Sequence, residues 1–338
     1  MRHIVRLIVI VALLCTLFAG WLTRFATMPL PLSTSPLEFD IRSGLSLRAA
    51  SRQMANAGLG FSAWQFSWLG RLAGKDTAIK AGSYEVSFGI TAWDLLEKLT
   101  RGDMVQAEIV FLEGITFRQM RALLDKDPNI RHETRGWSDA EILTRLGAPE
   151  SHPEGLFFPD TYLFAKQTSD IEILRRSYQA MKRRLAEEWA ARDPAIRYQN
   201  PYSALIMASL VEKETGMLSD RPLIASVFVN RLRRGMLLQT DPSVIYGLGE
   251  QFDGNLRKRD LTTDTPYNSY TRSGLPPTPI AMPSLASLRA ALHPAASNHL
   301  YFVARGDGSS VFSANLDDHN AAVNQYIRKR GDSADRGG

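Results

Sequence analysis

The chain opens with an apolar run that follows Arg2 and Arg6 and reaches Leu22. The run is roughly 16 to 19 residues long, at the short end of what a membrane-spanning helix needs. The two basic residues before it, against the single Arg24 after it, favour a cytoplasmic N-terminus. A cleaved signal peptide has the same layout, but no small-x-small cleavage site follows the run. We therefore predict an uncleaved anchor over residues 1–24.

A small module is predicted next. The proline- and serine-rich stretch MPLPLSTSP indicates a linker over residues 25–36. Residues 37–104 then show a strand, LEFDIRSG, two helical segments that end at glycines, a second strand in KAGSYEV, and a helix, TAWDLLEKLTRG. Thr91 and Asp94 have the spacing of a capping box at the start of that helix. Two helices between two strands resemble the LysM carbohydrate-binding module, so we expect a LysM-like α+β subdomain.

Residues 105–328 have a mixed α+β pattern. QAEIVFLEG is a predicted strand and EGLFFPDTYLFAKQTS is aromatic and extended, while LYFVARG and SSVFSAN predict a hairpin that turns at Asp307-Gly308. Helices are predicted in TFRQMRALLDKD, WSDAEILTRLG, residues 170–192, PYSALIMASLVEKETG and RPLIASVFVNRLRRG. Residues 329–338 are polar and are expected to be disordered. The expected fold class is α+β, with one transmembrane helix and a mixed α+β catalytic domain.

Composition narrows the class of protein. A chain of 338 residues, with 44% hydrophobic and 22% charged residues, suits two or three globular units rather than disorder. A net charge of +5 suits an anionic partner, such as anionic lipid, a cell-wall polymer or nucleic acid. No zinc-finger spacing, RNP-like motif or basic helix supports the last of these, so we expect no nucleic acid.

Neither cysteine nor histidine suggests a metal or a cofactor. The only cysteine, Cys15, lies in the apolar run, so the rest of the chain needs no disulfide and offers no thiol chemistry. His293, His299 and His319 lack the spacing of metal ligands such as H-E-x-x-H, and no phosphate-binding or dinucleotide-binding glycine pattern occurs. We expect no metal and no cofactor.

The segment PYSALIMASLVEKETG places a carboxylate on an apolar stripe. Each helical residue turns by about 100°, so one face carries Ile206, Met207, Leu210 and Val211. Glu214 is the next position on that stripe, and Met217 and Leu218 extend it if the helix continues. Glu212 lies roughly 160° away, nearly opposite. Glu214 is therefore the glutamate that we expect to face the core or the floor of a cleft.

Burial of Glu214 would have a chemical consequence. A carboxyl group without ionic partners in apolar surroundings is costly to ionise, so its pKa should rise. A glutamic acid that is protonated near neutral pH is suited to general-acid cleavage of a glycosidic bond. The structural alternatives are that Glu214 pairs with Arg221 or caps a neighbouring loop.

Two further stretches offer candidates. In QTDPSVIYG, Asp241 is either a second catalytic carboxylate or the N-cap of a helix that has Pro242 in its first turn. In TPYNSYTRSGLPPTPIAMPS, Tyr267, Asn268 and Tyr270 adjoin a proline-rich backbone, which suits a sugar groove or a plain structural loop. The basic stretch RLRRG is most simply a solvated helix face.

Seven stretches together resemble the YceG-like endolytic murein transglycosylases. They are KAGSYEV, EGLFFPDTYLF, ASLVEKETG, ASVFVNRLRRGMLLQTDPSVIYGLG, TPYNSYTRSGLPPTPIAMPS, ALHPA and LYFVARGDGSSVFSANLDDHN. The departures Thr278 and Met282 affect substrate fit rather than family. The resemblance implies a single-pass inner-membrane enzyme with a periplasmic catalytic domain, which cuts the β-1,4 bond from N-acetylmuramic acid to N-acetylglucosamine inside nascent strands. It also implies that the second glutamate of EKET, Glu214, is catalytic.

The mechanism implied needs one carboxylate. The 6-hydroxyl of the muramyl sugar attacks its own C1, so Glu214 first protonates the leaving oxygen and then accepts the hydroxyl proton, which leaves a 1,6-anhydro end and stops strand elongation. Residues expected to hold the sugar are Glu154, Gln239, Asp241, Tyr267, Asn268 and Tyr270. Expected partners are glycan strands, the inner membrane and peptidoglycan synthases.

Two other functions fit the same residues. In a hydrolase, Asp241 would position water for Glu214, and the product would be one water heavier. In a non-catalytic wall-binding protein, the LysM-like module would anchor or scaffold synthases.

Overall fold

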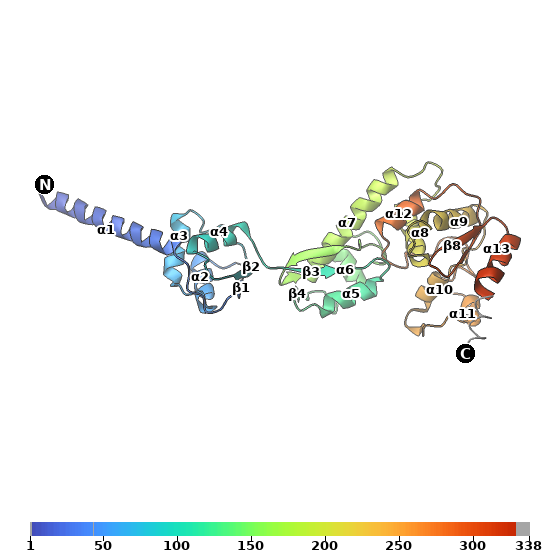
Figure 1. Cartoon of the computed structure of the whole chain (residues 1–338), viewed down its shortest axis with the longest axis horizontal. Coiled ribbons are helices and arrows are strands. Elements are labelled where there is room, and N and C mark those ends of the chain that lie inside the picture. The colour runs from blue at the N-terminus through green and yellow to red at the C-terminus, as the bar shows by residue number, and fades with distance from the viewer. Residues whose placement is uncertain (1, 43, 329–338) are drawn as a thin grey trace. The chain divides into compact units, whose positions relative to one another are not determined.

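The structure is a computed structural model that describes residues 2–42 and 44–328, and Figure 1 shows the order of its elements. It is a mixed α+β protein whose chain folds as two compact units. The first contains residues up to 108 together with 129–131 and 163–168, and the second contains the remainder from residue 109. The predicted disordered tail, 329–338, lies outside the described residues.

The first unit contains the elements α1 (Arg2–Thr27), β1 (Leu37–Ile41), α2 (Leu47–Asn56), α3 (Ala63–Leu72), β2 (Gly82–Val86) and α4 (Ala92–Arg101). The strands β1 and β2 pair antiparallel, from Leu37 opposite Val86 to Ile41 opposite Gly82. The predicted capping box of α4 is confirmed, since Asp94 N donates to Thr91 Oγ1 over 3.1 Å and Thr91 N donates to the Asp94 carboxylate over 3.2 Å. The order strand, helix, helix, strand therefore follows the sequence pattern.

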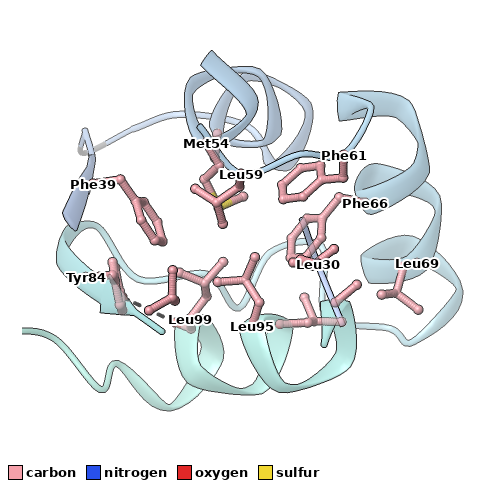
Figure 2. Close-up of a cluster of buried hydrophobic side chains, with 14 of the residues drawn as sticks. Leu30, Phe39, Met54, Leu59, Phe61, Phe66, Leu69, Tyr84, Leu95 and Leu99 are labelled. Carbon is pink, nitrogen blue, oxygen red and sulfur yellow. Dashed lines mark hydrogen bonds between the residues drawn. The ribbon is translucent and has the colours of Figure 1, made fainter. Parts of the chain in front are cut away.

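The core of the first unit is drawn in Figure 2, where Phe39 and Tyr84 from the two strands face the side chains of α2, α3 and α4. The predicted linker is part of this core, which corrects the sequence-based boundary. Leu30 is buried in the cluster, and the backbone forms bridges from Pro29 to Thr91 and from Leu32 to Leu59. Likewise α1 runs past the predicted end of the anchor, because its last turns bury apolar residues against α3 and α4.

From residue 106 onward the elements are β3 (Gln106–Val110), α5 (Phe117–Lys126), β4 (Ile130–Arg131), α6 (Asp139–Leu146), β5 (Thr161–Ala165), β6 (Thr168–Ser169), α7 (Asp170–Ala190), α8 (Pro201–Glu214), α9 (Arg221–Arg233), α10 (Asp241–Leu248), η1 (Gly249–Gln251), α11 (Lys258–Thr262), α12 (Leu285–Leu292), β7 (Tyr301–Ala304), β8 (Ser310–Ser313), α13 (Leu316–Val323) and η2 (Asn324–Arg328). The predicted hairpin is confirmed as β7 and β8, which pair from Tyr301 opposite Ser313 to Ala304 opposite Ser310.

The helix α8 is the centre of the second unit. It packs against α7, α9, α10 and α12, and every residue from Ala204 to Val211 is buried. Its start is set by Asn200, whose side-chain oxygen accepts from Ser203 N over 2.9 Å, and by Pro201 in the first turn. A helix buried around its whole circumference has no single core-facing stripe, so the stripe alone does not single out Glu214.

The structure decides two local points that the sequence left open. The helix ends at Glu214, because Thr215 takes an extended conformation, and Met217 and Leu218 are exposed rather than continuing an apolar stripe. The N-cap of α10 is Thr240, so Asp241 is its first residue and not its cap, although Pro242 does occupy the first turn as predicted.

Candidate active site

Glu214 is the last residue of α8 and stands half-buried where the helix stops. The Thr240 hydroxyl, just before α10, donates a hydrogen bond to Glu214 Oε1. Burial raises the pKa of Glu214 to about 7, while the Thr240 hydrogen bond and the positive charge of Arg231 lower it and the negative charge of Asp241 raises it. At neutral pH this carboxyl group therefore exists in both its protonated and its ionised form.

Glu214 opens into a cavity of about 330 Å³. Its lining comes from six separate segments of the second unit: Glu214, Arg231, Leu238 with Gln239 and Asp241, Tyr270, Phe302 and His319. Three of the residues predicted to hold sugar, Gln239, Asp241 and Tyr270, are thus placed beside Glu214. Arg231, Phe302 and His319, with the Thr240 hydroxyl, were not predicted.

Arg231 is buried and organises one wall of this cavity, so the predicted solvated face of RLRRG holds for the exposed Arg233 and Arg234 but not for Arg231. Its guanidinium group donates to three backbone carbonyls, at 2.7 Å for Leu300, 2.9 Å for Leu238 and 3.2 Å for Leu237. It also donates to Gln239 Oε1 over 3.2 Å. Gln239 has a φ of 52°, a left-handed conformation that is uncommon outside glycine. The hydrogen bond from Arg231 holds its side-chain amide in place.

Asp241 and Tyr270, which also line this cavity, form a hydrogen-bonded pair. The Tyr270 hydroxyl donates to Asp241 Oδ1. Burial raises the pKa of the Tyr270 hydroxyl, and the bond to Asp241 raises it further, so the hydroxyl keeps its proton and remains a donor. The pair presents one carboxylate and one aromatic ring to the cavity.

Asn268, although predicted to hold the sugar, does not line the cavity beside Glu214. It is fully buried, and its Nδ2 donates to three backbone carbonyls: Asp260 at 3.1 Å, Leu261 at 3.2 Å and Thr263 at 2.7 Å. Its Oδ1 accepts from Tyr270 N over 2.9 Å. Asn268 therefore holds the loop that carries Tyr270, rather than offering its own amide to a sugar.

A second, larger cavity of about 1010 Å³ contains the other two predicted residues, Glu154 and Tyr267. Glu154 Oε1 accepts from Phe117 N at the start of α5 over 3.0 Å, and Oε2 accepts from the Tyr246 hydroxyl over 3.1 Å. Burial raises the pKa of Glu154 to about 7, although both of these hydrogen bonds lower it. The Tyr246 and Tyr267 rings meet edge to face with centroids 4.9 Å apart, and Tyr267 pairs with the Thr278 hydroxyl over 2.9 Å.

The two cavities adjoin at two pairs of consecutive residues. Lys213 lines the larger cavity and the next residue, Glu214, lines the smaller one. Likewise Pro242 lines the larger cavity and the preceding residue, Asp241, lines the smaller one. The end of α8 and the start of α10 therefore separate two neighbouring hollows in the second unit.

Glu212, two residues before Glu214, has a different environment. Its Oε1 accepts from Arg221 Nη2 over 3.1 Å, and its Oε2 accepts from Ser284 N over 2.9 Å and from Ser284 Oγ over 2.6 Å. The Glu212 and Arg221 side chains are each only 5% exposed. Arg221 thus pairs with Glu212 rather than with Glu214, which excludes the predicted structural alternative of a Glu214–Arg221 ion pair.

Among residues 2–42 and 44–328, no group of three or more histidine, cysteine, aspartate or glutamate side chains could hold a metal ion. The cavity beside Glu214 is lined by acid, hydroxyl, amide, guanidinium and aromatic groups.

Comparison with known proteins identifies the family of this chain. The sequence model of the YceG-like family matches residues 39–325. The endolytic murein transglycosylase of Bacillus subtilis (strain 168) is 31% identical over 315 residues, which cover 88% of this chain and 87% of that protein. The protein of the same name from Streptococcus pneumoniae serotype 2 (strain D39) is 29% identical over 75% of this chain, which spans about half (52%) of that relative. A crystal structure of a yceG-like protein from Listeria monocytogenes is 30% identical, with a TM-score of 0.53 over 86% of this chain and 99% of its own.

Proposed function

The chain belongs to the YceG-like family, and from that membership we propose that it is an endolytic murein transglycosylase, a lyase that cuts peptidoglycan strands internally. Relatives that bear this name support the proposal at 29–31% identity over most of the chain. The observation that carries it is Glu214, a carboxyl group with a pKa raised to about 7 that opens into a cavity lined by polar and aromatic residues. This is the property that a general acid needs near neutral pH.

The bond cut is the β-1,4 linkage between N-acetylmuramic acid and N-acetylglucosamine. Protonated Glu214 gives its proton to the bridging oxygen as the bond from that oxygen to the muramyl C1 breaks. The 6-hydroxyl of the same muramyl residue forms a bond to C1, and its proton passes to the Glu214 carboxylate. The enzyme returns to its starting protonation state, and the products are a free N-acetylglucosamine hydroxyl and a 1,6-anhydro end.

The hydrogen bond to Glu214 supports different roles for its two carboxyl oxygens. Thr240 donates to Oε1, so the proton that is transferred belongs on Oε2. Asp241 lies in the same cavity and its negative charge raises the pKa of Glu214, so it is placed to favour the positive charge that develops on the sugar ring. Gln239 and Tyr270 offer an amide and a ring to the sugar in this cavity.

The larger cavity extends the proposed groove for a polymeric substrate. An enzyme that cuts inside a strand must hold sugars on both sides of the broken bond. Tyr246 and Tyr267 provide aromatic surface there, and Glu154 holds the Tyr246 hydroxyl in place. The cavity adjoins Glu214 through Lys213, so it is placed to hold neighbouring sugars of the same strand.

We place the enzyme at the bacterial inner membrane. The helix α1 is long and apolar enough to cross a bilayer, which supports a single anchor for a catalytic domain of residues 105–328. Arg2 and Arg6 favour a cytoplasmic N-terminus and a catalytic domain on the periplasmic side. The strand–helix–helix–strand order of residues 37–104 supports a LysM-like role in binding glycan, and synthases of peptidoglycan are proposed partners.

Digestion of purified glycan strands tests the function, with the products measured by mass. The wild-type chain should release fragments that end in the anhydro sugar, and Glu214→Gln should reduce their rate of formation by at least about a thousandfold, because general acid–base catalysis supplies about 10²–10⁴-fold in each role. Glu187→Gln removes an exposed carboxylate on α7 and serves as the matched control, which should cut at the wild-type rate.

The other outcomes of the digestion would each contradict one part of the proposal. Products one water heavier, with reducing ends, would identify a hydrolase in which Asp241, in the cavity with Glu214, directs water. If neither the wild type nor the control cuts any strand, the chain is a non-catalytic wall-binding protein. If Glu214→Gln cuts as fast as wild type, Glu214 is not the catalytic acid.

A further inference from the structure

The helix α3 has two apolar faces, and only one of them belongs to the core. Phe66 and Leu69 are buried in the first unit. On the other side stand Trp64, Trp68 and Leu72, which are four residues apart and therefore share one face of the helix. Their exposed fractions are 49%, 43% and 59%. Two exposed tryptophans and a leucine on one helix face form an apolar surface of the kind that marks an interaction site.

This surface is continuous with the apolar helix α1. The Trp21 and Trp64 rings stack with centroids 4.9 Å apart and planes 8° apart. Phe18, one turn earlier on α1, meets Trp68 edge to face at 6.0 Å. The exposed face of α3 therefore begins where α1 meets it, with aromatic rings on both sides of the junction.

The depth of the aromatic rings follows from the length of α1. From Ile4 to Trp21 the helix rises about 27 Å at roughly 1.5 Å per residue, close to the ~30 Å of a bilayer hydrocarbon core. An α1 that spans the bilayer thus places Trp21 at the membrane–water interface, the level that tryptophan prefers. Because Trp64 stacks on Trp21, α3 lies at the same level.

We propose that the face of α3 formed by Trp64, Trp68 and Leu72 inserts into the interfacial region of the bilayer, so that the first unit rests on the membrane surface. This inference rests on the proposed single anchor, but it goes beyond an anchor in assigning a second membrane contact. The partner is lipid because the surface continues that of α1. Two cations also suit phosphate headgroups: Arg24 is in the last turn of α1, and the Arg71 guanidinium carbon lies 5.9 Å from the Trp68 ring centre.

Fluorescence quenching of the full chain in phosphatidylcholine vesicles tests the proposal. Single-tryptophan variants would keep Trp64, Trp68 or Trp93 and carry phenylalanine at the other tryptophan positions. Trp93 is the matched control, because it is 40% exposed in the same unit and follows Thr91, which bridges to Pro29 beyond the end of α1. Lipids brominated near the headgroup end of their acyl chains should quench Trp64 and Trp68 several-fold more strongly than Trp93.

A second variant protects the test against misfolding of heavily substituted chains. Replacing only Trp64 and Trp68 by phenylalanine should remove much of the quenching caused by lipids brominated near the headgroup end, and should change quenching by deeply brominated lipids far less. Flotation with the vesicles is measured in parallel, because it reports whether the chain is bound to the bilayer at all.

The outcomes separate the two claims. Chains that float, with Trp64 and Trp68 quenched no more than Trp93, would overturn the second contact and leave the anchor in place. Chains that do not float would overturn the anchor and the second contact together, while leaving the transglycosylase activity to be judged by digestion. Shielding of Trp64 and Trp68 from aqueous acrylamide by added glycan strands, and not by lipid, would make this face a carbohydrate site and refute the proposal.

Discussion

Replacing Thr240 by valine isolates one of the forces that act on Glu214. Thr240 is buried, and its hydroxyl donates to Glu214 Oε1. That hydrogen bond favours the ionised carboxylate and so lowers a pKa that burial has raised to about 7. Valine has nearly the same shape but no hydroxyl, so the pKa of Glu214 should rise further in the variant.

The size of the change follows from the strength of hydrogen bonds to charged and neutral acceptors. A bond to an ionised group contributes about 1.5–3 kcal/mol, against about 0.5–1.5 kcal/mol for a neutral one, a difference of roughly 1–1.5 kcal/mol. One pH unit corresponds to about 1.36 kcal/mol, so the pKa of Glu214 should rise by about one unit. The acid form is present below the pKa and is lost as pH rises through it. In wild type, kcat/KM should therefore fall above pH of about 7, and in Thr240→Val the fall should begin about one unit higher.

The assay is the initial rate of anhydro-ended product from glycan strands at low substrate concentration, measured over a range of pH. Thr144→Val is the matched control, because its exposed hydroxyl on α6 donates only to the Ala140 carbonyl, over 2.8 Å. Its profile should coincide with that of wild type. If the alkaline fall of Thr240→Val stays in place or moves to lower pH, the Thr240 hydroxyl does not set the protonation of the catalytic acid.

Two further predictions concern stability. Glu212→Gln should lower the free energy of unfolding in urea by about 2–3 kcal/mol, because it leaves the buried Arg221 with only the exposed Glu113 carboxylate, 3.9 Å away. The folded fraction should keep its activity, and an unchanged midpoint with a lower kcat would contradict this. Gly155→Ala should lower the thermal midpoint by much more than Gly136→Ala does. Both glycines have left-handed φ values, 78° and 88°, so the backbone strain is similar. Of the two, only an alanine Cβ at Gly155 would meet another residue, Pro279, at 2.4 Å. Equal losses in the two glycine variants would show that backbone conformation alone sets the cost.

Features of the fold that depend on local residues could be predicted from the sequence. The capping box of α4 and the hairpin of β7 and β8 each depend on residues a few positions apart, and both are confirmed. The packing of the predicted linker could not be foreseen, because Leu30 is buried by α2, α3 and α4, which lie far along the chain. The eight-residue helix α12 was missed for a related reason. It follows a proline-rich loop, and α8, against which it packs, lies about 70 residues earlier in the chain.

The candidate site shows the same limit. Gln239, Asp241 and Tyr270 were found because they belong to motif stretches, and the structure brings them to Glu214. Thr240, Arg231, Phe302 and His319 were missed although they also lie in motif stretches, because the sequence does not show which side chains of a stretch face Glu214. Arg231 did carry a signal, since it stands four residues after the buried Val227 on α9 and so falls on a buried position of that helix.

The two glutamates at the end of α8 differ in their partners, and this difference supports Glu214 rather than Glu212 as the proposed acid. Both lie at the end of a helix that is buried all round, so helical position cannot separate them. Their partners can. Glu212 has the guanidinium group of Arg221 and two donors from Ser284, which compensate its charge in the core. Glu214 has a single hydroxyl as hydrogen-bond donor to Oε1 and a neighbouring aspartate, so burial prevails and its pKa rises to about 7. The ion pair to Arg221, nine residues after Glu212, is therefore what separates the two glutamates, since Arg231 lowers the pKa of Glu214 only in part against the larger effect of burial.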